Sequence, residues 1–88
     1  MIYRVSDEAC KVTKRFFEAL EYLKREKKIH GLKTFTDKYG FNYWNTVTIK
    51  NQPEKRFLKV DYLIYICRDY GISSEWLLLG KGEMTKDA

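Results

Sequence analysis

The sequence predicts an all-α protein, a compact bundle of about five helices in a single domain that spans residues 1–88. The chain contains only one proline and five glycines, fewer turn signals than a fold built from many short strands needs. Apolar residues recur at steps of three and four along much of the chain, which is the spacing of one helix face. A chain of this length can bury one modest core, so we expect one domain.

The first helix is predicted to run from Ser6, which can cap its N-terminus, to about Lys27. The two residues after Ser6 are acidic, which suits the positive end of a helix. We expect Gly31 to end this segment and residues 1–5 to form a loose arm before it. The apolar positions that define the buried face are Ala9, Val12, Phe16, Leu20 and Leu23.

A helix-turn-helix pattern follows over residues 33–50. Residues 33–39 are typical of a short helix, and Gly40 can take the left-handed backbone conformation without the steric cost that a side chain brings. Asn42 can then cap a second short helix, which begins at Tyr43 and ends before Pro53. A turn of three or four residues with a glycine between two short helices characterises this motif.

Two more helices are predicted in the C-terminal half. The helix over residues 57–70 is expected to bury a stripe of Val60, Leu63, Ile64 and Cys67, with Gly71 as its C-terminal cap. Its tyrosines are expected to pack in the core or at its rim rather than to stack on nucleotides. Ser73 can cap a last short helix, and the polar tail, residues 81–88, is expected to fray.

Composition and charge narrow the function. The formal net charge is +5 and the isoelectric point is about 9.2, which fits a polyanionic partner but is common in small proteins. One histidine and two cysteines are too few for a zinc site, so we expect free thiols and neither a metal nor a cofactor. No apolar run reaches the ~20 residues that span a membrane, and no signal peptide is recognisable. We therefore expect a cytoplasmic protein, and the lack of a phosphate loop or nucleophile motif predicts that it is not an enzyme.

Particular residues around the turn and at the C-terminal end resemble those of a known family. The pattern covers roughly residues 10–84 and resembles the lambda-repressor-like helix-turn-helix regulators of bacteria and their phages. Its ending is similar to that of many small regulators of this kind in Bacteroidetes-type genomes. The residues that carry the resemblance are Phe35, Thr36, Gly40, Phe41 and Ile49, then Asp69-Tyr70-Gly71-Ile72-Ser73 and Trp76-Leu77-Leu78-Leu79-Gly80-Lys81-Gly82-Glu83-Met84.

Two threonines depart from the family pattern. The family usually has a small residue, mostly alanine, at the position of Thr36, where the two motif helices approach closely. It usually has a large apolar residue at the position of Thr46. Val47 or Ile49 can take the place of that residue, so two phases of the second motif helix, one residue apart, stay open.

The resemblance implies sequence-specific binding of double-stranded DNA by a repressor-like transcriptional regulator, with residues 42–50 as the recognition helix. The N-terminal residues of such a helix meet base edges in the major groove, where asparagine can pair with adenine. Trp44 can meet thymine methyl groups or pack inward. The base-reading candidates are Asn42, Tyr43, Trp44, Asn45 and Thr48, and the phosphate-contact candidates are Lys33, Thr34, Lys50, Lys55 and Arg56.

Four large apolar residues stand in a row in the last helix, at Trp76, Leu77, Leu78 and Leu79. On a helix they point in directions about 100° apart, more than one small domain can easily cover. We expect them to form the interface of a homodimer, because regulators of this architecture commonly bind DNA as symmetric dimers.

Two other functions stay open. A protein-interaction, dimerisation or antitoxin-type adaptor on the same fold is favoured by the aromatic pair Tyr43 and Trp44, since aromatic residues are enriched at protein interfaces. Non-specific binding of nucleic acid through charge alone is the third alternative.

Overall fold

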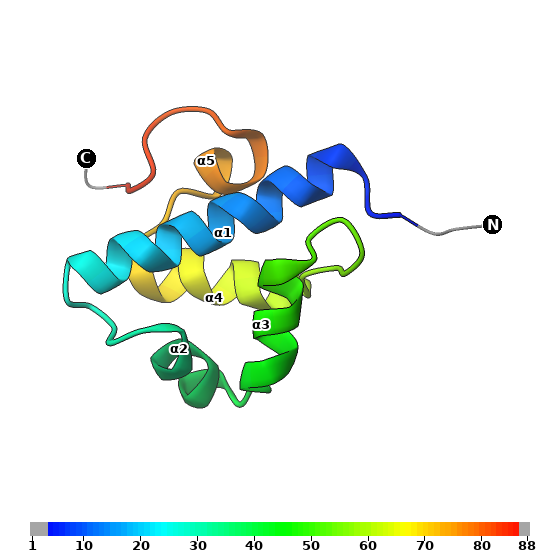
Figure 1. The fold of residues 1–88 in the computed structure, drawn as a ribbon. Coiled ribbons are helices and arrows are strands. Elements are labelled where there is room, and N and C mark those ends of the chain that lie inside the picture. The colour runs from blue at the N-terminus through cyan, green and yellow to red at the C-terminus, as the bar shows by residue number, and fades with distance from the viewer. Residues whose placement is uncertain (1–3, 87–88) are drawn as a thin grey trace.

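The computed structural model describes residues 4–86, which form five helices. They are α1 (Asp7–Arg25), α2 (Leu32–Tyr39), α3 (Tyr43–Asn51), α4 (Val60–Tyr70) and α5 (Ser74–Leu79). The long α1 crosses the middle of the molecule, with α5 on one side of it and α2 and α3 on the other (Figure 1). The prediction of an all-α bundle of about five helices is confirmed.

Helix α1 supplies one wall of the core. Ser6 caps it as predicted, because its hydroxyl accepts a hydrogen bond from the Ala9 N–H at 3.1 Å. The helix ends at Arg25, earlier than expected, and Lys27 rather than Gly31 takes the left-handed conformation, with φ of 61°. Gly31 is extended and precedes α2. The buried face of α1 comprises Thr13, Phe16, Phe17, Ala19, Leu20 and Leu23.

Aromatic rings join three of the helices at the centre. Phe16 of α1 meets Phe35 of α2 edge-on, with ring centroids 5.5 Å apart. Phe41, in the turn after α2, stacks on Tyr62 of α4 with centroids 3.9 Å apart and an interplanar angle of 9°. Such pairs add to the apolar burial of the rings. The turn between α2 and α3 is therefore anchored to α4 through Phe41.

The prediction for α4 was wrong in its start and in its buried face. The helix begins at Val60, which is 62% exposed, and Ile64 is also exposed, whereas Tyr62 and Ile66 are buried. Leu63 and Cys67 are half-buried. The core takes the ring of Tyr62 because it stacks on Phe41 and its hydroxyl finds a buried partner. The predicted packing of the tyrosines is confirmed, since Tyr62, Tyr65 and Tyr70 all pack in or against the core.

Both predicted loose ends are held in place where the structure describes them. Val5 is buried, and its N–H donates to the Glu54 carbonyl at 3.0 Å. In the tail, the Ser73 N–H donates to the Met84 carbonyl at 2.8 Å, and Ile72 and Thr85 form an isolated antiparallel bridge. Residues 84–86 therefore lie against the segment between α4 and α5, while fraying of the tail stays a prediction. Residues 1–3 and 87–88, the remainder of the two predicted loose segments, lie outside the described range.

Helix α5 is fixed to α1 by a side chain. The Arg15 guanidinium donates from Nε to the Leu77 carbonyl at 2.7 Å and from Nη2 to the Leu78 carbonyl at 3.1 Å. These carbonyls lie at the C-terminal end of α5, where a cation is favourable. Ser73 caps the other end as predicted, accepting from the Trp76 N–H at 3.2 Å.

Candidate nucleic-acid interface

Helices α2 and α3 are joined by a turn of three residues, Gly40, Phe41 and Asn42. Gly40 has φ of 72°, in the left-handed region where a side chain is strained. The Phe41 N–H donates to the Thr36 carbonyl at 2.8 Å, which closes the end of α2. Asn42 caps α3 by accepting from the Asn45 N–H at 2.8 Å. The predictions for Gly40 and Asn42 are both confirmed.

Thr46 is the residue of α3 that faces the core, and it is fully buried. Its hydroxyl donates to the Asn42 carbonyl at 2.9 Å and lies 2.6 Å from the Tyr62 hydroxyl. A threonine hydroxyl has one proton, so Tyr62 is the donor to Thr46. Thr46 itself therefore occupies the inward position, and Val47 and Ile49 lie half-buried beside it. The burial of Thr46 fixes the rotation of α3 about its axis: Thr46, rather than Val47 or Ile49, faces the core.

Thr36 is also fully buried, at the approach of α2 to α3. Its hydroxyl donates to the Lys33 carbonyl one turn earlier at 3.1 Å. Both threonines that depart from the family pattern thus have their hydroxyls hydrogen-bonded, which removes the cost of burying them.

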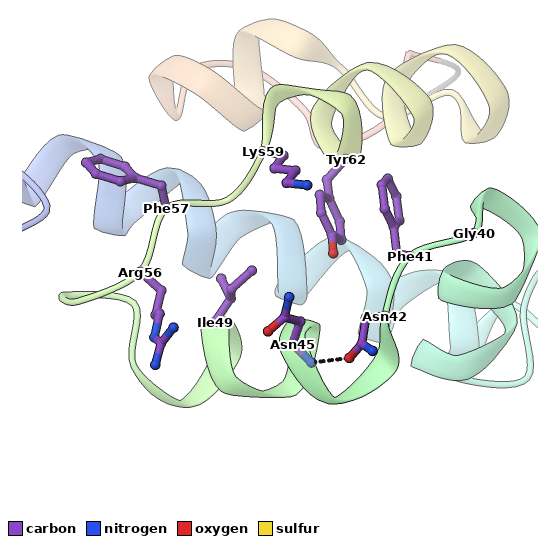
Figure 2. Close-up of a pocket in the computed structure, with 9 residues that line it drawn as sticks. All are labelled: Gly40, Phe41, Asn42, Asn45, Ile49, Arg56, Phe57, Lys59 and Tyr62. Atoms are coloured by element: carbon purple, nitrogen blue, oxygen red, sulfur yellow. Dashed lines mark hydrogen bonds between the residues drawn. The ribbon is translucent and has the colours of Figure 1, made fainter.

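Beyond Thr46, the residues of α3 form three rows. The outermost row, which we call the crest, consists of Trp44, Thr48 and Asn51, spaced at steps of four and three. On one side, Asn45 and Ile49 line a hollow of about 280 Å³ that is closed by the loop after α3 and the start of α4 (Figure 2). On the other side, a hollow of about 290 Å³ separates α3 from α1 and the start of α2; its lining includes Tyr43, Val47 and Lys50. Helix α3 therefore stands out as a ridge between two hollows.

The predicted base-reading residues differ in their exposure and in whether their polar atoms already form hydrogen bonds within the protein. Trp44 is 72% exposed, which excludes the alternative that it packs inward. Asn42 is exposed, but its side-chain oxygen is used for the cap. Asn45 is exposed and its amide extends into the first hollow (Figure 2). The Thr48 hydroxyl donates to the Trp44 carbonyl at 3.0 Å, and Tyr43 is half-buried.

Sequence reasoning missed one residue of the crest. Asn51 is the last residue of α3 and is exposed. It lies seven positions after Trp44, two helical turns along the same face, so the spacing alone could have identified it.

Two of the predicted phosphate contacts, Lys33 and Thr34, already have a partner within the protein. Lys50, Lys55 and Arg56 are exposed, whereas Lys33 forms an ion pair with Asp37 at 3.3 Å. The Thr34 hydroxyl accepts from the His30 N–H at 3.2 Å, so it holds the loop before α2. Arg56 lines the first hollow and Lys50 the second. Lys59, which was not among the predicted phosphate contacts, also lines the first hollow, on the side of Tyr62 (Figure 2).

The positive charge of the chain is concentrated around α2 and α3. Residues 27–59 contain eight lysines and arginines but only two acidic residues, Asp37 and Glu54. The rest of the chain contains nine basic and ten acidic residues. Helix α3 itself carries no acidic residue. The segment that holds the two short helices therefore carries all of the net positive charge.

A charged cluster braces α2 against α4 at the edge of this segment. The Tyr39 hydroxyl donates to Asp69, and the Arg68 guanidinium donates to both oxygens of the same carboxylate, at 2.8 and 2.9 Å. Hydrogen bonds from Arg68 and Tyr39 hold the pKa of Asp69 well below its usual range. Burial, followed by the contact with Asp69, raises the pKa of Tyr39. The Tyr39 ring stacks on Tyr65 with centroids 4.4 Å apart, so the brace fixes the end of α2.

The structure removes Leu77 from the predicted dimer interface, and the interface itself stays a prediction. Leu77 is fully buried in the core of its own chain, and Trp76 is half-buried against that core. Leu79 is 64% exposed and Leu78 is also exposed. Leu78 shares an apolar hollow of about 180 Å³ with the exposed residues of α4. We call the exposed set Val60, Ile64, Leu78 and Leu79 the α4–α5 patch.

No helix in the described part of the chain is long and apolar enough to cross a membrane. Among the same residues, no three His, Cys, Asp or Glu side chains are grouped as a metal site requires. Comparison with protein-family models, with curated proteins and with solved structures finds no match to this chain.

Proposed function

We propose that this chain is a sequence-specific double-stranded DNA-binding protein, a repressor-like transcriptional regulator of the lambda-repressor-like helix-turn-helix type. The observation that carries the proposal is that the protruding helix α3 lies within the most basic segment of the chain. A ridge with a largely polar crest, α3, follows a three-residue turn, and the segment around it holds eight basic and two acidic residues. Clustered positive charge on one segment is the electrostatic footprint of a nucleic-acid-binding protein.

The arrangement suits the major groove of B-DNA, which is about 12 Å wide and admits one helix. With α3 in the groove, its N-terminal residues Trp44 and Asn45 meet base edges. Arg56 and Lys59 on one flank and Lys50 on the other then lie toward the two phosphate backbones, which they attract through charge. Base contacts give sequence choice in this scheme, and the lysines and arginines give affinity.

The test begins with selection of a preferred site from a pool of random duplexes, followed by anisotropy titrations on the selected and random duplexes. Asn45→Ala is expected to weaken binding to the selected site by about 1–3 kcal/mol and to relax choice at one base pair. Its affinity for random duplex should stay the same, because the phosphate contacts remain.

A pair of charge variants gives the control. Lys50→Ala is expected to weaken binding to all sequences alike and to reduce the salt slope by about one. Lys81→Ala removes the same charge from the loop after α5, on the other side of α1 (Figure 1), and should leave the slope unchanged. Recovery of no preferred sequence, or equal losses for the two lysine variants, contradicts the proposal.

The proposed partner of the α4–α5 patch is a second copy of this chain. Half-sites one turn of DNA apart are read by two-fold dimers, and in such a dimer one patch meets the same patch of the other copy. Val60, Ile64 and Leu78 line one hollow between the two helices, and Leu79, the next residue of α5, is also exposed, which suits that contact. Light scattering over a dilution series should show a dimer that Leu79→Glu converts to a monomer, and a wild-type monomer at high micromolar concentration contradicts this part.

The alternative function is a protein-interaction adaptor, and one observation favours it. Trp44 is 72% exposed on α3, and exposed aromatic residues are what protein interfaces use. The two functions differ in salt dependence and in sequence choice. An adaptor binds neither selected nor random duplex with the steep salt slope that phosphate contacts impose.

A further inference from the structure

Trp44 is the most exposed large apolar residue in the described part of the chain, at 72%. It stands on the crest of α3, in the first turn of that helix. Its indole meets the Tyr43 ring edge-on, with centroids 5.0 Å apart and an interplanar angle of 84°. The Lys33 ammonium in turn lies 5.9 Å from the centre of the Tyr43 ring. The indole is thus oriented by its neighbours while most of its surface faces solvent.

The neighbours of Trp44 on the exposed side of α3 are polar. Thr48 and Asn51 complete the crest, and Asn45 lies beside it. The exposed aliphatic residues Val60, Ile64, Leu78 and Leu79 belong instead to α4 and α5. A protein interface has an apolar core inside a polar rim, whereas α3 offers one exposed indole and the half-buried ring of Tyr43 rather than such a core. The partner that fits is a polar, anionic surface with isolated apolar groups.

The major groove has this character. Its floor consists of hydrogen-bonding base edges, and its one apolar group is the C5-methyl of thymine. We propose that Trp44 contacts a thymine methyl group, so that the recognised half-site contains a thymine at the position that meets the first turn of α3. This inference rests on the proposed DNA-binding function and specifies one base of its site. The Trp44 indole acts through shape and apolar contact, without a hydrogen bond to the base.

Replacing thymine with deoxyuridine tests the contact, because uracil keeps every hydrogen-bonding group of thymine and lacks only the methyl. Each thymine of the selected duplex is replaced in turn, and the affinity is measured with wild-type and Trp44→Ala proteins. One replacement per half-site is expected to weaken wild-type binding roughly threefold to tenfold, the range for loss of a buried methyl group. Trp44→Ala is expected to bind the thymine and uracil duplexes equally.

Two controls accompany this measurement. Lys81→Ala should keep the full difference between thymine and uracil, and uracil outside the selected site should have no effect. Trp44 is exposed, so its replacement by alanine leaves the core intact, and Trp44→Phe should retain part of the difference.

The outcomes separate this inference from the proposed function. If a site is selected but Trp44→Ala remains as sensitive to uracil as the wild type, the contact is wrong while DNA reading stands. If Trp44→Ala binds every duplex as the wild type does, Trp44 makes no contact with DNA and the inference fails. If no site is selected, the proposed function fails first, before any thymine is tested.

Discussion

Replacing Thr46 with valine tests whether one buried hydroxyl fixes α3 on the core. Valine has nearly the same shape, so packing changes little and the loss is that of the hydrogen bonds. The Thr46 hydroxyl donates to the Asn42 carbonyl at 2.9 Å and accepts from the Tyr62 hydroxyl at 2.6 Å. Thr46→Val therefore leaves the Tyr62 O–H, on a side chain that is 3% exposed, without its acceptor.

The two ends of this hydrogen bond are not equivalent. A buried donor left unsatisfied costs about 1–3 kcal/mol, so Thr46→Val is expected to fall in that range. Tyr62→Phe leaves Thr46 donating to Asn42 and is expected to cost about 0.5–1.5 kcal/mol, the usual value for one hydrogen bond. When both residues are replaced, no orphan donor remains. The valine substitution should then add little to the cost of Tyr62→Phe.

Urea unfolding of the four proteins measures this coupling. The free energies of unfolding are compared at equal slope, with tryptophan fluorescence as the signal, since Trp44 and Trp76 lie on α3 and α5. The expected coupling between the two substitutions is about 1 kcal/mol or more. If valine costs the same with and without the Tyr62 hydroxyl, the hydrogen bond between Thr46 and Tyr62 contributes nothing to stability and the reasoning is wrong.

Three other substitutions probe the supports of the fold. Arg15→Gln should lower the free energy of unfolding by about 1–2 kcal/mol through loss of charged hydrogen bonds to the end of α5, while Lys14→Gln, at the exposed neighbouring position, should change little. Gly40→Ala should cost about 1 kcal/mol from its φ of 72° alone, because the added carbon meets open space. Asp69 has a pKa lowered in the folded state, so its stabilisation is present above its unfolded pKa of about 3.9 and is lost as the pH falls below it. Asp69→Asn should flatten the decline of the urea midpoint in that acid range and lower the midpoint at neutral pH.

Features fixed by local chemistry could be predicted from the sequence. Ser6, Asn42 and Ser73 each cap a helix through the side-chain oxygen, because the hydrogen bond spans only three residues. Gly40 ends α2 for a reason that is equally local. Gly40 and Asn42 placed the turn and the start of α3, and hence the segment that we propose meets DNA.

Features set by contacts distant in sequence could not be predicted in the same way. In α4, aliphatic and aromatic residues both recur at helical spacing, and the choice of the Tyr62 face depends on Phe41, twenty-one positions earlier. The burial of Val5 depends on the Glu54 carbonyl, and the order of the tail depends on Gly71 and Ser73. The concentration of positive charge around α2 and α3 could have been counted from the sequence, but its meaning for a site needed the fold.

The orientation of α3 links the core to the proposed reading of bases. Most helices of small domains are held by an apolar stripe, whereas the buried residue of α3 is a threonine, bonded to Tyr62. A rotation by one residue, about 100°, would move Trp44 off the crest. Tyr62→Phe is therefore expected to reduce the ratio of affinities for selected and random duplex, while the affinity for random duplex and its salt slope stay unchanged. An unchanged ratio would show that apolar contacts alone hold α3 in its orientation on the core, since the Thr46–Asn42 hydrogen bond lies within α3 and its own cap. A reduced ratio would make a buried tyrosine, which touches no base, a determinant of sequence choice.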